Sequence, residues 1–207
     1  MSRIKSVRRS CFTALLFALV FIGDRASAAP AGGLSPWGVG GSLGLANPVE
    51  HEFKIDQFKG GDANLWVQYE LEEKVVLRAT VGSLIAKGFY AGRTVSLGNG
   101  SLATAPDLKS RVDYGVVSVS YDFRESAWTS GLFAGLGVYR IRPESVAPEF
   151  APYQDRREKV WGAHVGVDTD VRLWKTLSLL GRITLHFPQS EKRREILIAG
   201  AGLLYRF

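Results

Sequence analysis

Cysteine and long apolar runs are what this chain most clearly lacks. Cys11 is the only cysteine among 207 residues, and it lies in an N-terminal segment that we expect to be removed during export. The remaining chain would then have neither disulfides nor a catalytic thiol. Beyond that segment, no apolar run reaches the roughly 20 residues of a membrane-spanning helix. His51 has no metal-ligand partner at a useful spacing, and we expect no metal site and no cofactor.

The first 28 residues have the three-part layout of a secretory signal peptide. A basic start precedes an apolar run from Cys11 to Gly23, and Ala26-Ser27-Ala28 supplies the small residues that cleavage requires. The apolar run is too short to span a membrane. We therefore predict that residues 1–28 are a signal peptide and that residues 29–207 form one domain.

The basic character of the whole chain comes mostly from this N-terminal segment. The full sequence has a formal net charge of +6. Residues 1–28 contain five basic residues and one acidic residue, so their removal lowers the net charge to +2. Such a small charge does not indicate a nucleic-acid-binding surface, and we expect no nucleic-acid partner.

Residues 29–207 contain eight segments in which apolar residues alternate with small or polar ones. In the last segment, Leu203, Tyr205 and Phe207 share one face, whereas Gly202 and Arg206 lie on the other. Each segment is close to the roughly 10 residues with which a tilted strand crosses a bilayer. The eight predicted strands are Pro36–Ala46, Asn64–Leu71, Val75–Ala86, Val112–Phe123, Leu132–Ile141, Val160–Leu173, Leu177–Phe187 and Ile196–Phe207.

The lengths of the connections also alternate along the chain. Short turns follow the second, fourth and sixth predicted strands, whereas long connections follow the first, third and fifth. Short periplasmic turns and longer extracellular loops are typical of transmembrane barrels. A soluble sandwich gives no reason for loop length to alternate. The sequence therefore predicts an all-β fold, an eight-stranded antiparallel up-and-down transmembrane β-barrel.

Aromatic residues gather near the ends of the predicted strands. Trp37, Trp128 and Tyr205 map to the rim with the short turns, whereas Trp161 and Phe187 map to the opposite rim. Amphipathic rings favour the level of the lipid headgroups, so we predict two aromatic girdles.

Three stretches of the chain carry closely spaced glycines: Trp37–Leu45, Leu132–Arg140 and Trp161–Leu173. They resemble the strands of the small eight-stranded bacterial outer-membrane barrels, a superfamily that includes the OmpA transmembrane domain and OmpX-like proteins. The last strand, which ends on Phe207, resembles the C-terminal signature of such barrels. The resemblance implies export through the periplasm, location in the outer membrane, and recognition of Phe207 by the barrel-assembly machinery.

The predicted inward faces carry four acids and four arginines. An eight-stranded barrel is just wide enough for side chains to fill it, and buried charges must be paired. We therefore predict an internal ion-pair network in a filled lumen, unlike the open channel of a general porin, and we expect His164 to be a hydrogen-bonded lumen residue. The charged residues are Glu70, Asp122, Asp168, Asp170, Arg78, Arg172, Arg182 and Arg206.

Two basic clusters are predicted at the extracellular rim. Arginine binds phosphate in a bidentate way, so we expect these clusters to bind lipopolysaccharide. The alternative is an ordinary solvated rim, because acids lie beside both clusters. The predicted site comprises Arg156, Arg157, Lys159, Lys192, Arg193 and Arg194.

Two functions remain open from the sequence. The first is a monomeric barrel with a structural, ligand-binding or surface-interaction role, whose partners are outer-membrane lipids and lipopolysaccharide. The second is a lipid A-modifying enzyme, because lipid A deacylases of this size resemble the chain in fold and use a His-x-Ser pair with a Glu. His186 is suitably placed, but Pro188 occupies the serine position, and Ser190 and Glu191 fit only a shifted arrangement. No catalytic residue is therefore assigned.

Overall fold

A computed structural model describes residues 35–49, 60–87, 93–106, 108–125, 128–144, 147–153, 156–190 and 195–207. The predicted signal peptide lies outside these ranges. In the part of the chain that the structure describes, no helix has the length and apolar character needed to cross a membrane.

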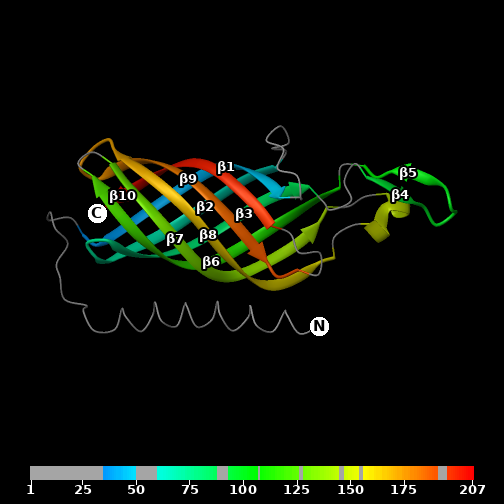
Figure 1. The fold of residues 1–207 in the computed structure, drawn as a ribbon, viewed down its shortest axis with the longest axis horizontal. Helices are drawn as coiled ribbons and strands as arrows, with labels where there is room; N and C mark the ends of the chain where they lie inside the picture. Colours follow the sequence, from blue (N-terminus) through cyan, green and yellow to red (C-terminus); the bar gives the residue numbers. More distant parts are fainter. Residues whose placement is uncertain are drawn as a thin grey trace.

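Eight long strands close into a single antiparallel barrel (Figure 1). Each strand pairs with the barrel strands before and after it in the sequence, and β1 pairs with β10 to close the sheet. This arrangement confirms the predicted eight-stranded up-and-down barrel. The barrel strands are β1 (Trp37–Val49), β2 (Gly60–Glu72), β3 (Val75–Lys87), β6 (Lys109–Glu125), β7 (Trp128–Pro143), β8 (Glu158–Arg172), β9 (Leu177–Pro188) and β10 (Glu195–Arg206).

The two ends of the barrel differ in the length of their connections. At one end, which we call the turn end, the strands are joined by residues 73–74, 126–127 and 173–176, and the C-terminus lies there (Figure 1). At the other end, the loop end, the connections are residues 50–59, 88–108, 144–157 and 189–194. The predicted alternation of short and long connections is therefore present.

Two loop-end connections carry a small folded element that the sequence did not predict. Strands β4 (Thr94–Ser96) and β5 (Leu102–Thr104) form a hairpin, and the 3-10 helix η2 (Pro148–Tyr153) packs against it. Val95 is buried in the contact, and the Tyr153 hydroxyl donates a hydrogen bond to the Ser96 carbonyl. This loop unit extends away from the barrel along its long axis (Figure 1).

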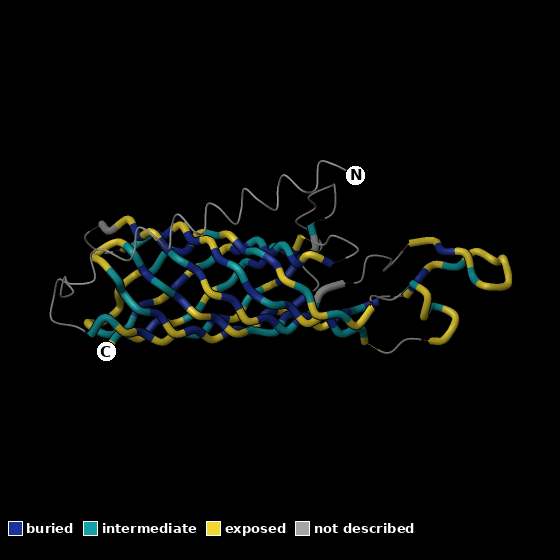
Figure 2. The backbone as a smooth tube through the Cα atoms, turned by 90° about the horizontal axis from the view of Figure 1, so that it is seen from below, coloured by how far each residue is buried: buried dark blue, intermediate teal, exposed yellow. Residues whose placement is uncertain are grey.

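The barrel strands alternate between exposed and buried residues along most of their length (Figure 2). Leu43 and Leu65 on the outside are 72% and 66% exposed, whereas Trp66, the next residue along β2, is 2% exposed inside the barrel. Many of the exposed outward residues are large and apolar. The predicted assignment of the apolar face to the outside is therefore correct.

Inward glycines make room for inward aromatic rings. Gly40 pairs across the sheet with Trp66, and a Cβ atom at Gly40 would lie 2.3 Å from the indole ring. Gly166 pairs with Phe133 in the same way, and a Cβ atom there would lie 2.5 Å from the phenyl ring. The glycine spacing seen in the sequence thus follows from packing large rings inside a narrow barrel.

Candidate functional site

The lumen is the most enclosed part of the molecule, and its loop-end half is apolar. Nine buried side chains from β1, β3, β6, β7 and β10 form one cluster there. Leu84, Tyr139 and Ile196 in this cluster are each at most 1% exposed. The members are Ala46, Leu84, Val112, Tyr114, Val116, Tyr139, Ile141, Ile196 and Ile198.

This apolar cluster was not predicted from the sequence, although β6 contains a signal for it. Val117 and Val119 point outward as predicted, but Val112 and Val116 point inward, so the apolar set changes face between Val116 and Val117 without a bulge. The neighbouring outward residue Arg111 is exposed. The polarity of the two faces therefore inverts near the loop end.

A buried ion-pair group occupies the middle of the lumen. The Asp168 carboxylate accepts hydrogen bonds from Arg78 at 2.6 Å and from Arg182 at 3.3 Å. The guanidinium of Arg182 also lies 4.3 Å from the ring centroid of Trp66. On the turn-end side, Trp66 packs with Leu180 and Leu204 in a second buried apolar cluster.

A third ion pair lies near the turn end, where Arg206 contacts Asp170 at 3.2 Å and donates a 2.7 Å hydrogen bond to Ser178. The predicted pairing of inward acids with arginines is thus present for Asp168 and Asp170. Arg172, which the prediction also placed in the network, is exposed at the end of β8.

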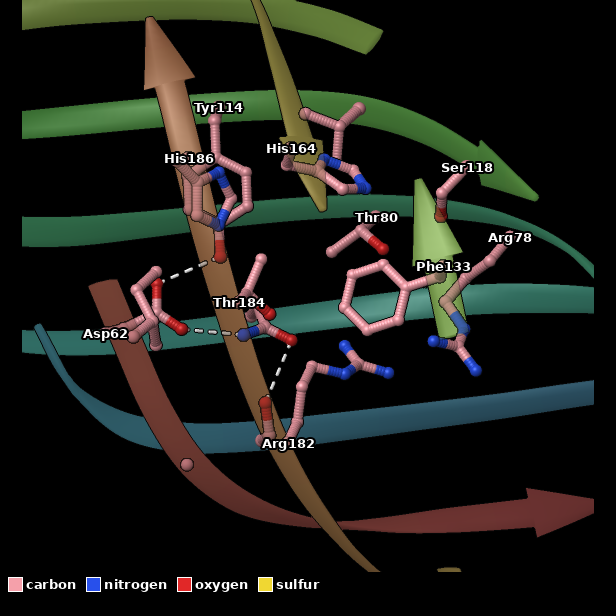
Figure 3. A pocket seen from close by; sticks show the side chains of 15 residues that line it. Asp62, Arg78, Thr80, Tyr114, Ser118, Phe133, His164, Arg182, Thr184 and His186 are labelled. Carbon is pink, nitrogen blue, oxygen red and sulfur yellow. Dashed lines mark hydrogen bonds between the residues drawn. The ribbon is translucent and has the colours of Figure 1, made fainter. Parts of the chain in front are cut away.

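A small polar cavity lies between the ion-pair group and the apolar cluster (Figure 3). Its volume is about 20 Å³, which exceeds the roughly 10–15 Å³ that one water molecule needs. On one wall, Asp62 accepts hydrogen bonds from the Tyr114 hydroxyl at 2.9 Å and from the Asn64 amide at 2.6 Å. Ser42 extends this chain with a 3.0 Å bond to Asn64.

Several buried nitrogen atoms in the lumen have no hydrogen-bond partner among the described residues. They include the indole nitrogen of Trp66, Nε of Arg78 and of Arg182, and Nδ1 of His164. The expectation that His164 is a hydrogen-bonded lumen residue stays a prediction, because its Nδ1 lies beside the cavity without a protein partner. One or two waters in the cavity would supply partners for the nitrogen atoms of Arg78, His164 and Arg182, whose side chains line it.

The two lumen histidines lie side by side on the neighbouring strands β8 and β9. His164 pairs with His186, and their ring centroids lie 5.5 Å apart. His186 is 3% exposed, and its Nδ1 shares a 3.0 Å hydrogen bond with the Tyr139 hydroxyl. The proposed deacylase base therefore points into the lumen, where acyl chains outside the barrel could not reach it. Of its suggested partners, Ser190 is buried and Glu191 lies outside the described residues.

The predicted lipopolysaccharide site is described only in part. Arg156 and Arg157 are exposed just before β8, and Lys159 is exposed on β8 at the loop end. Residues 192–194 lie outside the described residues, so the meeting of the two clusters stays a prediction.

The predicted assembly signal, Phe207, lies at the turn end. It is 52% exposed, and its ring contacts Tyr205 edge-on with centroids 5.4 Å apart. Its carbonyl accepts a 2.6 Å hydrogen bond from the Ser35 backbone amide. The ring is thus accessible on the outside of the closing strand, and its role in assembly stays a prediction.

No family model matches the sequence, and no curated protein matches it. Solved structures do resemble the fold. Neisserial surface protein A is 16% identical, with a TM-score of 0.59 over 84% of this chain and 99% of that one. OprG from Pseudomonas aeruginosa is 11% identical, with a TM-score of 0.55 over 86% of this chain and 99% of that one. The N-terminal β-barrel domain of Pseudomonas aeruginosa OprF is 10% identical, with a TM-score of 0.54 over 84% and 99% of the two chains. This chain therefore has the fold of the small eight-stranded outer-membrane barrels.

Proposed function

We propose that this protein is an integral barrel of the bacterial outer membrane with a closed lumen, and that it presents the loop unit at the cell surface for interaction with other molecules. The observation that carries the proposal is the arrangement of polarity. An apolar outer surface surrounds a lumen that holds buried ion pairs and two apolar clusters. Only a bilayer makes such an exterior favourable over so large a continuous area.

The packing of the lumen supports a role other than general diffusion. An eight-stranded barrel leaves little room inside, and the cavity of about 20 Å³ holds no more than about two waters. The apolar cluster that contains Ile198 lies on the loop-end side of the ion-pair group, and the cluster that contains Leu180 lies on its turn-end side. Planar-bilayer recordings should therefore show no large, stable conductance. A wide and steadily open channel in the wild-type protein would contradict the closed lumen.

The loop unit is the part of the molecule that supports a surface-interaction role. It has its own buried contacts, and Leu102 on β5 is 74% exposed. Binding residues are often found on loops that a rigid scaffold holds in place. The fold of the compared outer-membrane proteins supports the same location for this chain.

Epitope insertion tests the location and the orientation together. A tag inserted after Asn99, at the tip of the loop unit, should be labelled by antibody on intact cells. A matched tag after Lys175, in a turn-end connection, should be labelled only after the outer membrane is permeabilised. Labelling of the Lys175 tag on intact cells would contradict the orientation, and recovery of the protein in the soluble fraction would contradict the membrane location.

A further inference from the structure

The inversion of polarity at the loop end marks where the lipid-facing surface stops. On β6, the outward residues Val117 and Tyr121 are 55% and 47% exposed and apolar. Toward the loop end, the outward positions become Asp113 and Arg111, while the inward positions become Val112 and Tyr114. Charged residues on the outer surface are expected only beyond the hydrocarbon region.

On β7 and β8, the outward residues also become charged at this level. Arg140 lies between Asp113 on β6 and Lys159 on β8 in one row of paired residues. Arg111 pairs with Arg142 in the next row toward the loop end. Because outward residues of paired strands are neighbours on the barrel surface, these side chains form one patch. We define the rim site as Arg111, Arg140, Arg142 and Lys159.

The height of the apolar surface agrees with this level. On β8, Trp161 lies two residues below Lys159 and is 69% exposed on the outside, as expected of an aromatic residue at the headgroup level. From Trp161 to the outward residue Val171, ten strand residues span about 33 Å, or about 25 Å along the axis of a barrel whose strands tilt about 40°. An outer-membrane apolar band is about 25 Å tall. Lys159 and Arg140 therefore lie just beyond it.

The rim site has more positive than negative charge. Asp113 is the acid beside it, and it accepts hydrogen bonds from Arg142 and from Ser83 at 2.9 Å. In the described part of the chain, no ion pair joins Arg111, Arg140 or Lys159 to an acid. Lys109 and Glu144 occupy the next outward row toward the loops and add no net charge.

We propose that the rim site binds the phosphate groups of phosphorylated glycolipid in the outer leaflet. The proposal rests on the proposed outer-membrane location, and it assigns lipid binding to β6, β7 and β8. The site shares only Lys159 with the patch predicted from sequence. Arginine side chains at headgroup height can bind phosphate in a bidentate way while the apolar surface below contacts the acyl chains.

The test compares binding of lipid A to the wild-type protein and to two variants in phosphatidylcholine vesicles. The rim variant is Arg111→Gln, Arg140→Gln and Lys159→Gln. The control variant removes the same charge from exposed turn-end residues through Lys74→Gln, Arg172→Gln and Lys175→Gln. Quenching of tryptophan fluorescence by spin-labelled, bisphosphorylated lipid A gives the half-saturating lipid fraction.

We expect the rim variant to need about tenfold more lipid A for half-saturation, because three exposed cation–phosphate contacts are lost. The control variant should match the wild type, and added salt should weaken only binding by proteins with an intact rim site. Dephosphorylated lipid A should bind all three proteins equally weakly, and free inorganic phosphate should not compete at millimolar concentration.

Equal half-saturation for the rim variant and the wild type would overturn the rim site, as would an equal loss in the control variant. Strong competition by inorganic phosphate would overturn the assignment to a lipid. Failure of the wild-type protein to insert into vesicles would instead contradict the proposed membrane location, so the two failures are distinguishable.

Discussion

Replacing Asp168 with Asn should cost this barrel much of its stability. The Asp168 carboxylate is the direct partner of two buried guanidinium groups, at 2.6 Å from Arg78 and 3.3 Å from Arg182. The side chains of Arg78 and Asp168 are 5% and 8% exposed. The substitution keeps the size of the side chain and removes its charge, so both arginines lose their paired acid.

The expected loss is about 3–5 kcal/mol of unfolding free energy, the range for removing one partner of a buried ion pair. Asp113→Asn is the matched control, because Asp113 also pairs with an arginine, Arg142, but those side chains are 31% and 36% exposed. A pair so accessible to water should contribute under about 1 kcal/mol. Replacing the whole buried group with apolar residues of similar volume should recover most of the loss.

Urea titrations in phospholipid vesicles, followed by tryptophan fluorescence, measure these differences. The comparison that matters is Asp168→Asn against Asp113→Asn in the same lipid. If Asp168→Asn costs under about 1 kcal/mol, or if both variants lose the same amount, the ion-pair group is not the buried element described above.

Three further outcomes are expected. Gly166→Ala should destabilise the barrel by about 1–3 kcal/mol, because its Cβ would lie 2.3 Å from a backbone oxygen. Gly115→Ala should change stability little, since nothing lies within 4 Å of its Cβ position, and equal urea midpoints for the two would refute the packing argument. Val165→Arg on the outer surface should cost about 2–4 kcal/mol in lipid, unlike a substitution at Asn99 in the loop unit, and equal tolerance would argue against a lipid-facing surface. Deletion of Phe207 should lower outer-membrane abundance on immunoblots of fractionated cells, and unchanged abundance would count against its role as an assembly signal.

The sequence by itself determined the strand count, the strand order and the outward face of the barrel. Period-two alternation is a local property, and each strand carries it independently of its partners. The pattern around Leu203, Tyr205 and Phe207 thus gave the outward face of β10, and the length of each connection gave the two ends. The alternation could not give the strand ends, because strand pairing continues beyond the apolar surface. Strand β6, for example, has 17 residues and extends past both ends of the predicted Val112–Phe123 strand.

Only the tertiary structure decided which inward residues meet. Arg78 and Asp168 are 90 residues apart in sequence, and the lumen brings them together because the barrel closes across its width. The register of neighbouring strands packs the glycines against aromatic rings, and His164 lines the lumen cavity. The rim site depends on register, since Arg111, Arg140 and Lys159 become neighbours only when three strands pair in one alignment. Local alternation specifies which way a side chain points, but the register of the closed sheet specifies what it contacts.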